Sequence, residues 1–408
     1  MRVQRCKGTR DLSPAEMKRF RLIEGVFRDS CIKWGYNEVR TPTLEYLHLF
    51  TSTGTLTPGR LGKTYSFLDW DGWSGERVVL RPDGTIPIAR LYIDSLEEEG
   101  LAKLFYVTNV FTFDDTGTET REKWQCGAEL IGAGSTLADI ELVTLALEVL
   151  KKIGLKNVEL RLSHAGLIRA LLAKFGLNEE EQGRMLDRIL DGDEKALAGV
   201  KAENPELGRT LSPLLEMKGK SSGFLKNLKA LFNSDMPELK PSLDNFVQVV
   251  EFLEEVGVKY RIDIASGRGF EYYTGVMYQL IAGGQHVGGG GRYDALIPLM
   301  GGKDIPASGF ALYLDRLMSG IKADTPAEPA GVLIKPGSGE GALKEAFSLA
   351  ARLHEAGHTA EVHLGGAEPG GIKWLVEAGK KGFVLTDKVN KGKAEAGTVD
   401  GLLKKLKT

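Results

Sequence analysis

LFYVTNVFTFDDTGTETREKWQCGAELI, residues 104–131, decides the fold. It holds two strand-like runs, Leu104 to Phe113 and Gln125 to Ile131, joined by a short polar segment that contains a glycine. Runs of this length that are rich in β-branched and aromatic residues predict strands. Because the polar segment is too short for a crossover helix, we expect the two strands to pair in an antiparallel sheet.

The flanking sequence extends this sheet and covers it with helices. Two further strand-like runs, Thr64 to Leu68 and Arg77 to Leu80, come before it with a hairpin turn between them. A helix is predicted after Ser13, which can cap it together with Glu16. Apolar residues at helical spacing predict another helix over about 137–153. The predicted fold class is therefore α+β, an antiparallel sheet flanked by helices.

The remainder of the chain predicts two domains. Residues 1–322 are expected to form the core domain, with a small helical insertion at about 177–240 and a last helical stretch at about 309–321. A linker composition, Thr-Pro-Ala-Glu-Pro-Ala, precedes a small C-terminal α/β domain at 331–408. Its predicted elements are a strand at 331–334, a helix at 340–356, a strand at 359–364, a helix at 372–378 and a strand at 382–385.

The composition is that of a globular protein without a bulk preference for nucleic acid. The 408 residues carry a formal net charge of −2, and the sequence pI is about 6.4. The three cysteines are odd in number and have no metal-ligand spacing, so we expect free thiols and no metal. The N-terminus leads into no apolar stretch, and no apolar run approaches the roughly 20 residues that span a bilayer. These features favour a soluble, cytoplasmic protein.

Four segments combine glycine and charged or aromatic residues where a core would use aliphatic ones. The turn at 81–85 offers a carboxylate and a hydroxyl for a ligand ammonium, although Asp83-Gly84 also suits a plain turn. Gln125, Gly127 and Glu129 share one face of a strand, which fits either a polar binding floor or an exposed face. Tyr272 and Tyr273 concentrate hydrogen-bonding groups, or simply begin a strand. The glycines at 288–291 lack the context of a dinucleotide loop, and more often let backbones or a ligand approach.

Together these segments resemble the histidyl-tRNA synthetase family of class II aminoacyl-tRNA synthetases over nearly the whole chain. The matching motifs, in chain order, are Lys7 to Leu12, Arg81 to Thr85, Arg268 to Tyr273, Gly289 to Asp294 and Gly309 to Leu317. The resemblance implies a six-stranded antiparallel sheet and a dimer. It also implies a histidine pocket, in which Asp83, Thr85 and Gln125 hold the α-ammonium and Glu129 and Tyr273 the imidazole, with Tyr272 and Arg268 beside them.

The nucleotide side departs from that family. Thr112 stands where a synthetase has the arginine that grips the α-phosphate, and the loop after it is acidic and about one residue shorter. Tyr313 replaces a glycine and would crowd the nucleotide, whereas Arg268 and Arg316 match the remaining catalytic cations. We therefore predict a degenerate ATP site at Thr112, Tyr313 and Arg316, with no catalytic residues.

The same combination resembles the regulatory subunits of short-form ATP phosphoribosyltransferase, which are paralogues of the synthetase. The segments that favour this resemblance are Arg81 to Asp83, Asn109 to Phe111, Glu129 to Gly132, His164 to Gly166 and Tyr272 to Gly275. It implies a non-catalytic, histidine-sensing subunit of histidine biosynthesis, without a cofactor and without tRNA. Its partner would be the short catalytic subunit, and the assembly a hetero-octamer containing a homodimer of this chain. The alternatives are a histidine–tRNA ligase, favoured by Arg268 and Arg316, and a paralogue with another amino-acid-binding role.

Overall fold

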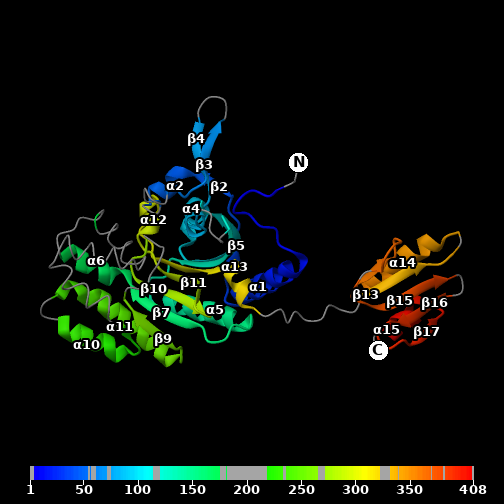
Figure 1. The fold of residues 1–408 in the computed structure, drawn as a ribbon. Helices are drawn as coiled ribbons and strands as arrows, with labels where there is room; N and C mark the ends of the chain where they lie inside the picture. Colours follow the sequence, from blue (N-terminus) through cyan, green and yellow to red (C-terminus); the bar gives the residue numbers. More distant parts are fainter. Residues whose placement is uncertain are drawn as a thin grey trace. The chain divides into compact units, whose positions relative to one another are not determined.

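The chain divides into two compact units, Met1–Lys322 and Ala323–Thr408, each with its own sheet (Figure 1). The computed structural model describes residues 4–53, 56, 61–70, 75–113, 120–174, 181, 218–232, 236–264, 272–321, 331–338, 340–368, 370–379 and 382–406. Most of the predicted helical insertion, and the linker at 322–330, lie outside the described residues.

Unit 1 is built on a nine-stranded sheet with the order β1-β5-β6-β12-β11-β10-β7-β9-β8. Its strands are β1 (Asn37–Glu38), β5 (Ala102–Phe111), β6 (Glu122–Ile131), β7 (Glu159–His164), β8 (Lys218–Gly219), β9 (Tyr260–Asp263), β10 (Val276–Ala282), β11 (Gln285–Arg292) and β12 (Ala307–Tyr313). The expectation that the runs at 64–68 and 77–80 extend this sheet is wrong. They belong to a separate three-stranded sheet, β2 (Leu44–Tyr46), β3 (Ser66–Trp70) and β4 (Gly75–Leu80), and the β3–β4 hairpin projects from the rest of unit 1 in Figure 1.

The described helices of unit 1 lie around this sheet. They are α1 (Pro14–Lys33), α2 (Leu47–Thr51), α4 (Thr85–Ser95), α5 (Thr136–Lys152), α6 (Ala165–Lys174), α10 (Ser222–Phe232), α11 (Lys240–Glu255), α12 (Leu296–Leu299) and α13 (Leu314–Gly320), with 3-10 turns η1 (Glu97–Glu99) and η2 (Pro237–Leu239). The predicted start of α1 is confirmed, because Ser13 and Glu16 form a reciprocal capping box.

The predicted fold class is confirmed. Strands β5, β6, β12, β11, β10 and β7 pair antiparallel in that order, which gives the six-stranded antiparallel core expected from the resemblance. The sheet is larger than expected, because β1 and β9 add parallel pairs and β8 adds an edge strand. The sequence predicts a strand at 260–264, which matches β9 (Tyr260–Asp263), whereas β1 and β8 have only two residues each and carry little sequence signal.

The two faces of the core sheet differ in chemistry. Phe27 of α1 makes edge-on ring contacts with Phe105 of β5 and Phe310 of β12. These two strand residues flank Ala128 of β6 in register, so this face is apolar and covered by α1. Because side chains alternate along a strand, Gln125, Gly127 and Glu129 all point to the opposite face. That face therefore carries the predicted polar residues.

One predicted helix of unit 1 is wrong in its first half. Residues 309–313 belong to strand β12, and only Leu314–Gly320 form helix α13. The segment Gly309-Phe310-Ala311-Leu312-Tyr313 pairs with β6 on one side and β11 on the other. The apolar residues of this short segment fit a buried strand as well as a helix. Pairing with the neighbouring strands therefore decides its conformation.

Unit 2 has a five-stranded mixed sheet with the order β14-β13-β15-β16-β17. Its elements are β13 (Gly331–Pro336), α14 (Ala342–Glu355), β14 (Ala360–Val362), β15 (Ile372–Gly379), β16 (Gly382–Asp387), β17 (Lys393–Ala396) and α15 (Val399–Leu406). The predicted helix at 372–378 is wrong, because this segment is the central strand β15. Its β-branched and aromatic residues, Ile372, Trp374 and Val376, suit a strand bounded by glycines.

The described residues offer no sign of two other features. No helix among them is both long and apolar enough to cross a membrane. They also contain no group of three or more His, Cys, Asp or Glu side chains placed to hold a metal ion. The three cysteines are free thiols, with Cys31 and Cys126 buried and Cys6 exposed.

Candidate functional site

Glu129 is the centre of the polar face. It lies on β6 and its side chain is almost completely buried, with 1% of the residue exposed. The hydroxyl of Thr85 donates a hydrogen bond of 2.8 Å to Oε1, and that of Tyr106 donates one of 3.3 Å to the same atom. The hydroxyl of Tyr293 donates to Oε2. Three elements, α4, β5 and the segment after β11, thus meet at one carboxyl group.

Glycines provide the space for this arrangement. A Cβ atom at Gly309 of β12 would lie 1.7 Å from Glu129 Oε2, so no other residue fits beside the carboxyl group. Cβ atoms at Gly84 and Gly127 would lie 2.5 Å and 2.2 Å from the ring of Tyr106. The Tyr106 ring therefore lies between two glycines, which hold its hydroxyl against Glu129.

The buried position changes the acidity of Glu129. Burial raises its pKa to about 8, although the hydroxyls of Tyr293, Thr85 and Tyr106 lower it and the nearby negative charge of Asp83 raises it. Burial also raises the pKa of the surrounding phenols, Tyr106 and Tyr293, well above the usual value. Near neutral pH the group that changes charge in this cluster is therefore Glu129.

The turn at 81–85 is fixed by its first residue. Arg81 is buried and donates hydrogen bonds to backbone oxygens of Asn109, Thr41 and Pro42, at 2.8, 2.9 and 2.9 Å. This clamp holds the end of β4 against β5. Asp83 then accepts a 2.9 Å hydrogen bond from the backbone N–H of Ile86 in the first turn of α4. The turn thus has a structural role and also brings Asp83 and Thr85 to the polar face.

Gln125 lies farther along β6 on the same face. It is 8% exposed, and its Oε1 atom is buried without a hydrogen-bond partner among the described residues. In register it stands between Thr108 of β5 and Tyr313 of β12. A buried carbonyl oxygen without a donor is costly, so this position is suited to receive a donor from a bound molecule.

The tyrosine pair, Tyr272 and Tyr273, lies near Glu129 on another segment of the chain. The rings of Tyr272 and Tyr273 are 5.4 Å apart, and the ring of Tyr272 is 5.5 Å from that of Tyr293, both in edge-on geometry. Burial raises the pKa of both phenols well above the usual value, and Glu129 and Asp83 raise it further. The structure thus brings five predicted residues close together in one polar cluster: Asp83, Thr85, Glu129, Tyr272 and Tyr273. Arg268 and Glu271 lie outside the described residues.

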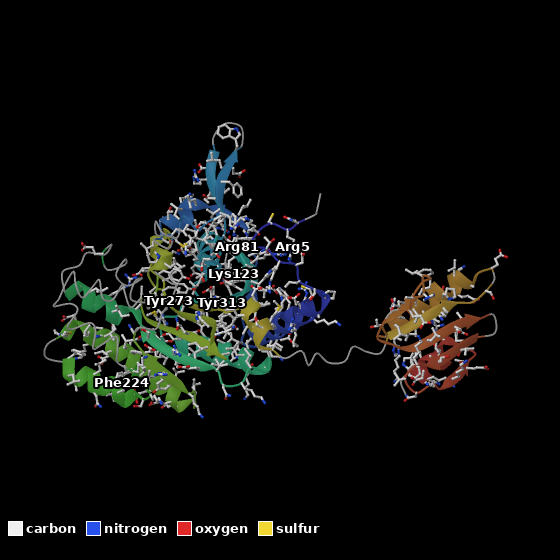
Figure 2. The ribbon with its side chains drawn as sticks, viewed as in Figure 1. Arg5, Arg81, Lys123, Phe224, Tyr273 and Tyr313 are labelled. Atoms are coloured by element: carbon white, nitrogen blue, oxygen red, sulfur yellow. The ribbon has the colours of Figure 1, made fainter. Side chains whose placement is uncertain are left out.

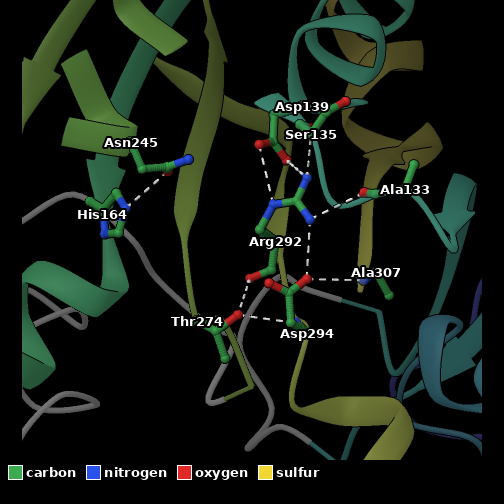
Figure 3. Close-up of polar contacts among 9 residues, drawn as sticks. All are labelled: Ala133, Ser135, Asp139, His164, Asn245, Thr274, Arg292, Asp294 and Ala307. Carbon is green, nitrogen blue, oxygen red and sulfur yellow. Dashed lines mark hydrogen bonds and ion pairs between the residues drawn. The ribbon is translucent and has the colours of Figure 1, made fainter. Parts of the chain in front are cut away.

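A buried ion pair lies where the segments that carry Tyr273 and Tyr293 meet (Figure 3). Arg292, at the end of β11, pairs with Asp139 of α5 at 2.9 Å and with Asp294 at 3.1 Å. Its backbone oxygen accepts a 2.8 Å hydrogen bond from the backbone N–H of Thr274, and the Thr274 hydroxyl accepts one of 3.0 Å from the N–H of Asp294. The segments that carry Tyr273 and Tyr293 are therefore joined through the residues next to them.

Two residues of the predicted degenerate ATP site, Tyr313 and Arg316, contact each other and His286. The guanidinium of Arg316 lies 5.1 Å from the ring centre of Tyr313, and it donates a 2.8 Å hydrogen bond to the backbone oxygen of His286. The His286 ring meets the Tyr313 ring edge-on at 5.3 Å. Figure 2 shows Tyr313 close to Tyr273, and Tyr313 contributes to the raised pKa of Tyr273. The acidic loop at 114–119 lies outside the described residues.

Sequence reasoning missed two residues that contact Glu129. Tyr293 belongs to the glycine-rich motif Gly289 to Asp294, and this motif alone does not indicate a contact with Glu129. Tyr106 alternates with Leu104 and Thr108 in a predicted strand, but its contact with Glu129 depends on the register between β5 and β6, which the sequence does not give.

Known proteins that resemble this chain show the family to which it belongs. A family model described as Histidyl-tRNA synthetase matches residues 8–317. The chain belongs to the histidyl-tRNA synthetase family. The match covers every residue of the polar face described above and ends in helix α13.

Within the family, the chain is similar both to relatives with a regulatory name and to relatives named as ligases. A protein of Dehalococcoides mccartyi (strain ATCC BAA-2100 / JCM 16839 / KCTC 5957 / BAV1), named ATP phosphoribosyltransferase regulatory subunit, is 55% identical over 376 residues, which is 92% of this chain and 91% of the relative. The histidine–tRNA ligase of Methanocaldococcus jannaschii is 33% identical over 389 residues, 93% of this chain and 90% of the relative.

A solved structure agrees with this placement. It is described as an ATP phosphoribosyltransferase regulatory subunit/histidyl-tRNA synthetase from Bacillus halodurans C. The match has a TM-score of 0.76 at 26% sequence identity, and it covers 91% of this chain and 95% of the other. The family resemblance inferred from the motifs is therefore confirmed over both units.

The glycine run of this family member is part of β11 and lies inside the sheet. Gly288 to Gly291 pair with β10 and β12. Cβ atoms at Gly289 and Gly290 would lie 2.5 Å and 2.2 Å from backbone oxygens of Tyr278 and Gly309. The expectation that these glycines let backbones approach is confirmed.

Proposed function

We propose that this chain is a non-catalytic, histidine-sensing regulatory subunit of ATP phosphoribosyltransferase and that it acts on the short catalytic form of that enzyme. The identity of 55% with relatives that carry the regulatory name supports the regulatory role. The proposed ligand rests on one observation above all: a buried polar pocket in which Gln125 Oε1 lacks a donor among the described residues. A ligand ammonium group would supply it.

Histidine fits the chemistry of this pocket. Its α-ammonium has three N–H donors, which we assign to Asp83, Thr85 and Gln125. We assign its imidazole ring to Glu129 and Tyr273, with Tyr272 beside them. A carboxyl group and a phenol suit this ring because each of its two nitrogens needs a hydrogen-bond partner. Arg268 completes the proposed set but lies outside the described residues.

The proposal that the chain is not a synthetase rests on the nucleotide side. Thr112 offers no cation where the family's motif has arginine, and loss of a donor of this kind costs roughly 10²–10³-fold in rate. Tyr313 packs against Arg316 and the ring of His286, and Arg316 donates a hydrogen bond to the backbone oxygen of His286, so this cation is already in contact with the chain. A pocket kept without this chemistry is best explained as a sensor.

The alternative is a histidine–tRNA ligase. It is favoured by the family model and by the ligases that are about a third identical to this chain. The purified protein should form no histidyl-adenylate, measured as histidine-dependent exchange of pyrophosphate into ATP. Exchange at a rate normal for synthetases would replace the proposed function by this alternative.

The decisive experiment adds this chain to the short catalytic subunit. Formation of phosphoribosyl-ATP should rise and become sensitive to histidine, because a ligand that prefers one state of an assembly shifts it by about 1–3 kcal/mol. The two chains should co-elute on size exclusion as a hetero-octamer that contains a homodimer of this chain. The proposal is wrong if the proteins neither associate nor change each other's activity.

A pocket variant separates sensing from assembly. Gln125→Met keeps the volume but loses the acceptor, which should weaken histidine binding by about 10- to 100-fold, as expected for a lost hydrogen bond to a charged group. It should still associate with the catalytic subunit. Gln285→Met, the same change at an exposed position of β11, is the control and should keep full histidine sensitivity.

A further inference from the structure

The carboxyl group of Glu129 has no cationic partner in the described part of the chain. Its hydrogen bonds come from three neutral hydroxyls, those of Thr85, Tyr106 and Tyr293. The charge that acts on it most strongly there is that of Asp83, which has the same sign. A buried carboxylate with only neutral donors and a negative neighbour is unstable unless it takes up a proton or a cation.

We propose that the empty pocket holds one proton on the Glu129 carboxyl group and that, on binding, this proton becomes the one shared between the carboxylate and the ligand's imidazole ring. The inference rests on the proposed function, because it takes histidine as the ligand. The O–H bond of the carboxylic acid breaks, its proton forms an N–H bond on the ring, and an imidazolium–carboxylate pair results. The complex then contains one ring-site proton, whichever partner carried it before.

The geometry favours a single shared proton at this position. Glu129 is almost completely buried, and hydrogen bonds from the hydroxyls of Thr85, Tyr106 and Tyr293 fix the position of its carboxyl group. The three hydroxyls can donate to the carboxylate after it has lost its proton. They lower the cost of the charged form in the empty pocket too, but burial outweighs them there and keeps the pKa of Glu129 raised. In the complex the imidazolium adds the positive charge that the empty pocket lacks.

Acid–base properties of the neighbouring groups fit this exchange. Burial raises the pKa of Glu129 to about 8, whereas the ring of free histidine titrates near 6.5. The phenols that lie near the carboxyl group on β5, on the tyrosine segment and on the turn after β11 have pKa values raised well above the usual range: Tyr106, Tyr272, Tyr273 and Tyr293. They stay neutral in the relevant window. Tyr278 of β10 lies on the opposite face of the sheet, in register with Phe310 and Ala128. Asp83 faces the carboxyl group as well, and Arg316 and His286 lie on Tyr313 farther along the same face.

Proton balance then depends on pH in a defined way. Between about pH 6.5 and 8 the Glu129 carboxyl group carries one proton before binding and the imidazole of free histidine carries no extra proton. Binding then exchanges no proton with solvent. Below about 6.5 both partners bring a proton and one is released. Above about 8 neither brings one and one is taken up. Histidine affinity should therefore be highest near neutral pH and fall by about tenfold per pH unit on either side.

The test is calorimetric titration of the full-length protein with L-histidine at pH 5.5, 7.2 and 8.8, in pairs of buffers with different ionisation enthalpies. We expect release of about one proton, no net exchange and uptake of about one proton, in that order. Glu129→Gln, which is isosteric and neutral, should lose the uptake at pH 8.8. Titration of the ligand's α-ammonium contributes equally to both proteins and cancels in their difference.

A second variant keeps the test decisive if Glu129→Gln does not fold. Tyr293→Phe removes one donor that lowers the pKa of Glu129, so its alkaline loss of affinity should begin at higher pH than in the wild type. If the wild type binds histidine but takes up no proton at pH 8.8, or if Glu129→Gln takes up as much, the inference is overturned and the proposed function stands. If histidine does not bind at any pH, both are rejected.

Discussion

At the residue scale, the charge and position of the buried Glu129 carboxyl group depend on the side chains and backbone immediately around it. Three hydroxyls point at it, and one glycine leaves it space. The glycine matters as much as the donors, because close packing tolerates no extra atom at a distance of 1.7 Å. Gly309 makes no side-chain hydrogen bond, but the space that it leaves is required for this position of the Glu129 carboxyl group.

Gly309→Ala tests this point. The new methyl group would overlap Glu129 Oε2, so either the carboxyl group or strand β12 must move. Overpacking of this kind costs about 1–3 kcal/mol, and histidine binding should be lost. Urea unfolding and calorimetry measure the two effects. Gly25→Ala in α1, where nothing lies within 4 Å of the new atom, is the control and should keep full binding. Unchanged histidine affinity in Gly309→Ala would contradict the described pocket.

At this scale the sequence predicted the acidic and polar members of the site better than its supporting residues. Glu129 and Gln125 were recognisable because a strand face with alternating polar residues is unusual in a core. Tyr106 and Gly309 were not, because their roles come from pairing across strands β5, β6 and β12. A single sequence shows which side chains alternate, but it does not give the register that brings them together.

At the scale of elements, the pocket is assembled from strand ends and the segments that follow them. His164 illustrates how firmly such an end can be fixed. It is the last residue of β7; its Nδ1 accepts a 3.2 Å hydrogen bond from the N–H of Leu167 in α6, and its Nε2 lies 3.2 Å from Asn245 Oδ1 of α11 (Figure 3). The ring therefore joins one strand to two helices as a neutral imidazole.

The pH dependence of stability should reveal this role. Burial lowers the pKa of His164 from 6.5 to about 4. Below pH 6.5 the unfolded chain binds a proton that the folded chain does not, so stability is lost as the pH falls from about 6.5 to 4. At 1.36 kcal/mol per pKa unit, the contribution is up to about 3 kcal/mol. Urea unfolding at several pH values should show that His164→Gln loses less stability in acid than the wild type.

A comparison with a second variant isolates the histidine from other buried groups. Glu129 and Asp139 have raised pKa values, so their contributions run the other way and decrease as the pH rises. Asn245→Asp places a carboxylate beside the ring, which should raise the pKa of His164 and reduce the loss in acid. If all three proteins lose stability in parallel between pH 6.5 and 4, His164 is not the cause.

The sequence predicted most elements but misjudged two short ones. Strands β5 and β6 and helices α1, α5 and α14 were predicted close to their observed bounds, because their periodicity is sustained. The sequence predicts helix at 309–313 and at 372–378, although both segments are strands inside their sheets. In both segments apolar residues fall on both faces, and the pairing with neighbours settles the conformation.

At the scale of the whole molecule, the two units have separate interiors. The hydrophobic cluster of unit 1 is built from buried residues between Phe20 and Met318, and that of unit 2 from residues between Val332 and Leu406. None of the buried residues is shared between these clusters. Every described residue assigned to the histidine pocket, from Asp83 to Tyr273, belongs to unit 1. Folding and ligand binding of unit 1 should therefore be separable from unit 2.

A chain that ends at Lys322 tests this separation. It should fold, because it keeps its complete core, and it should bind histidine with an affinity within about twofold of the full-length protein, since no pocket contact has been removed. Thermal unfolding and calorimetry measure the two properties. Association with the catalytic subunit is measured on the same sample, so that a role of unit 2 in assembly is distinguished from a role in sensing. A tenfold loss of histidine affinity in the shortened chain would mean that unit 2 supports the pocket, and that the regulatory signal does not originate in unit 1 alone.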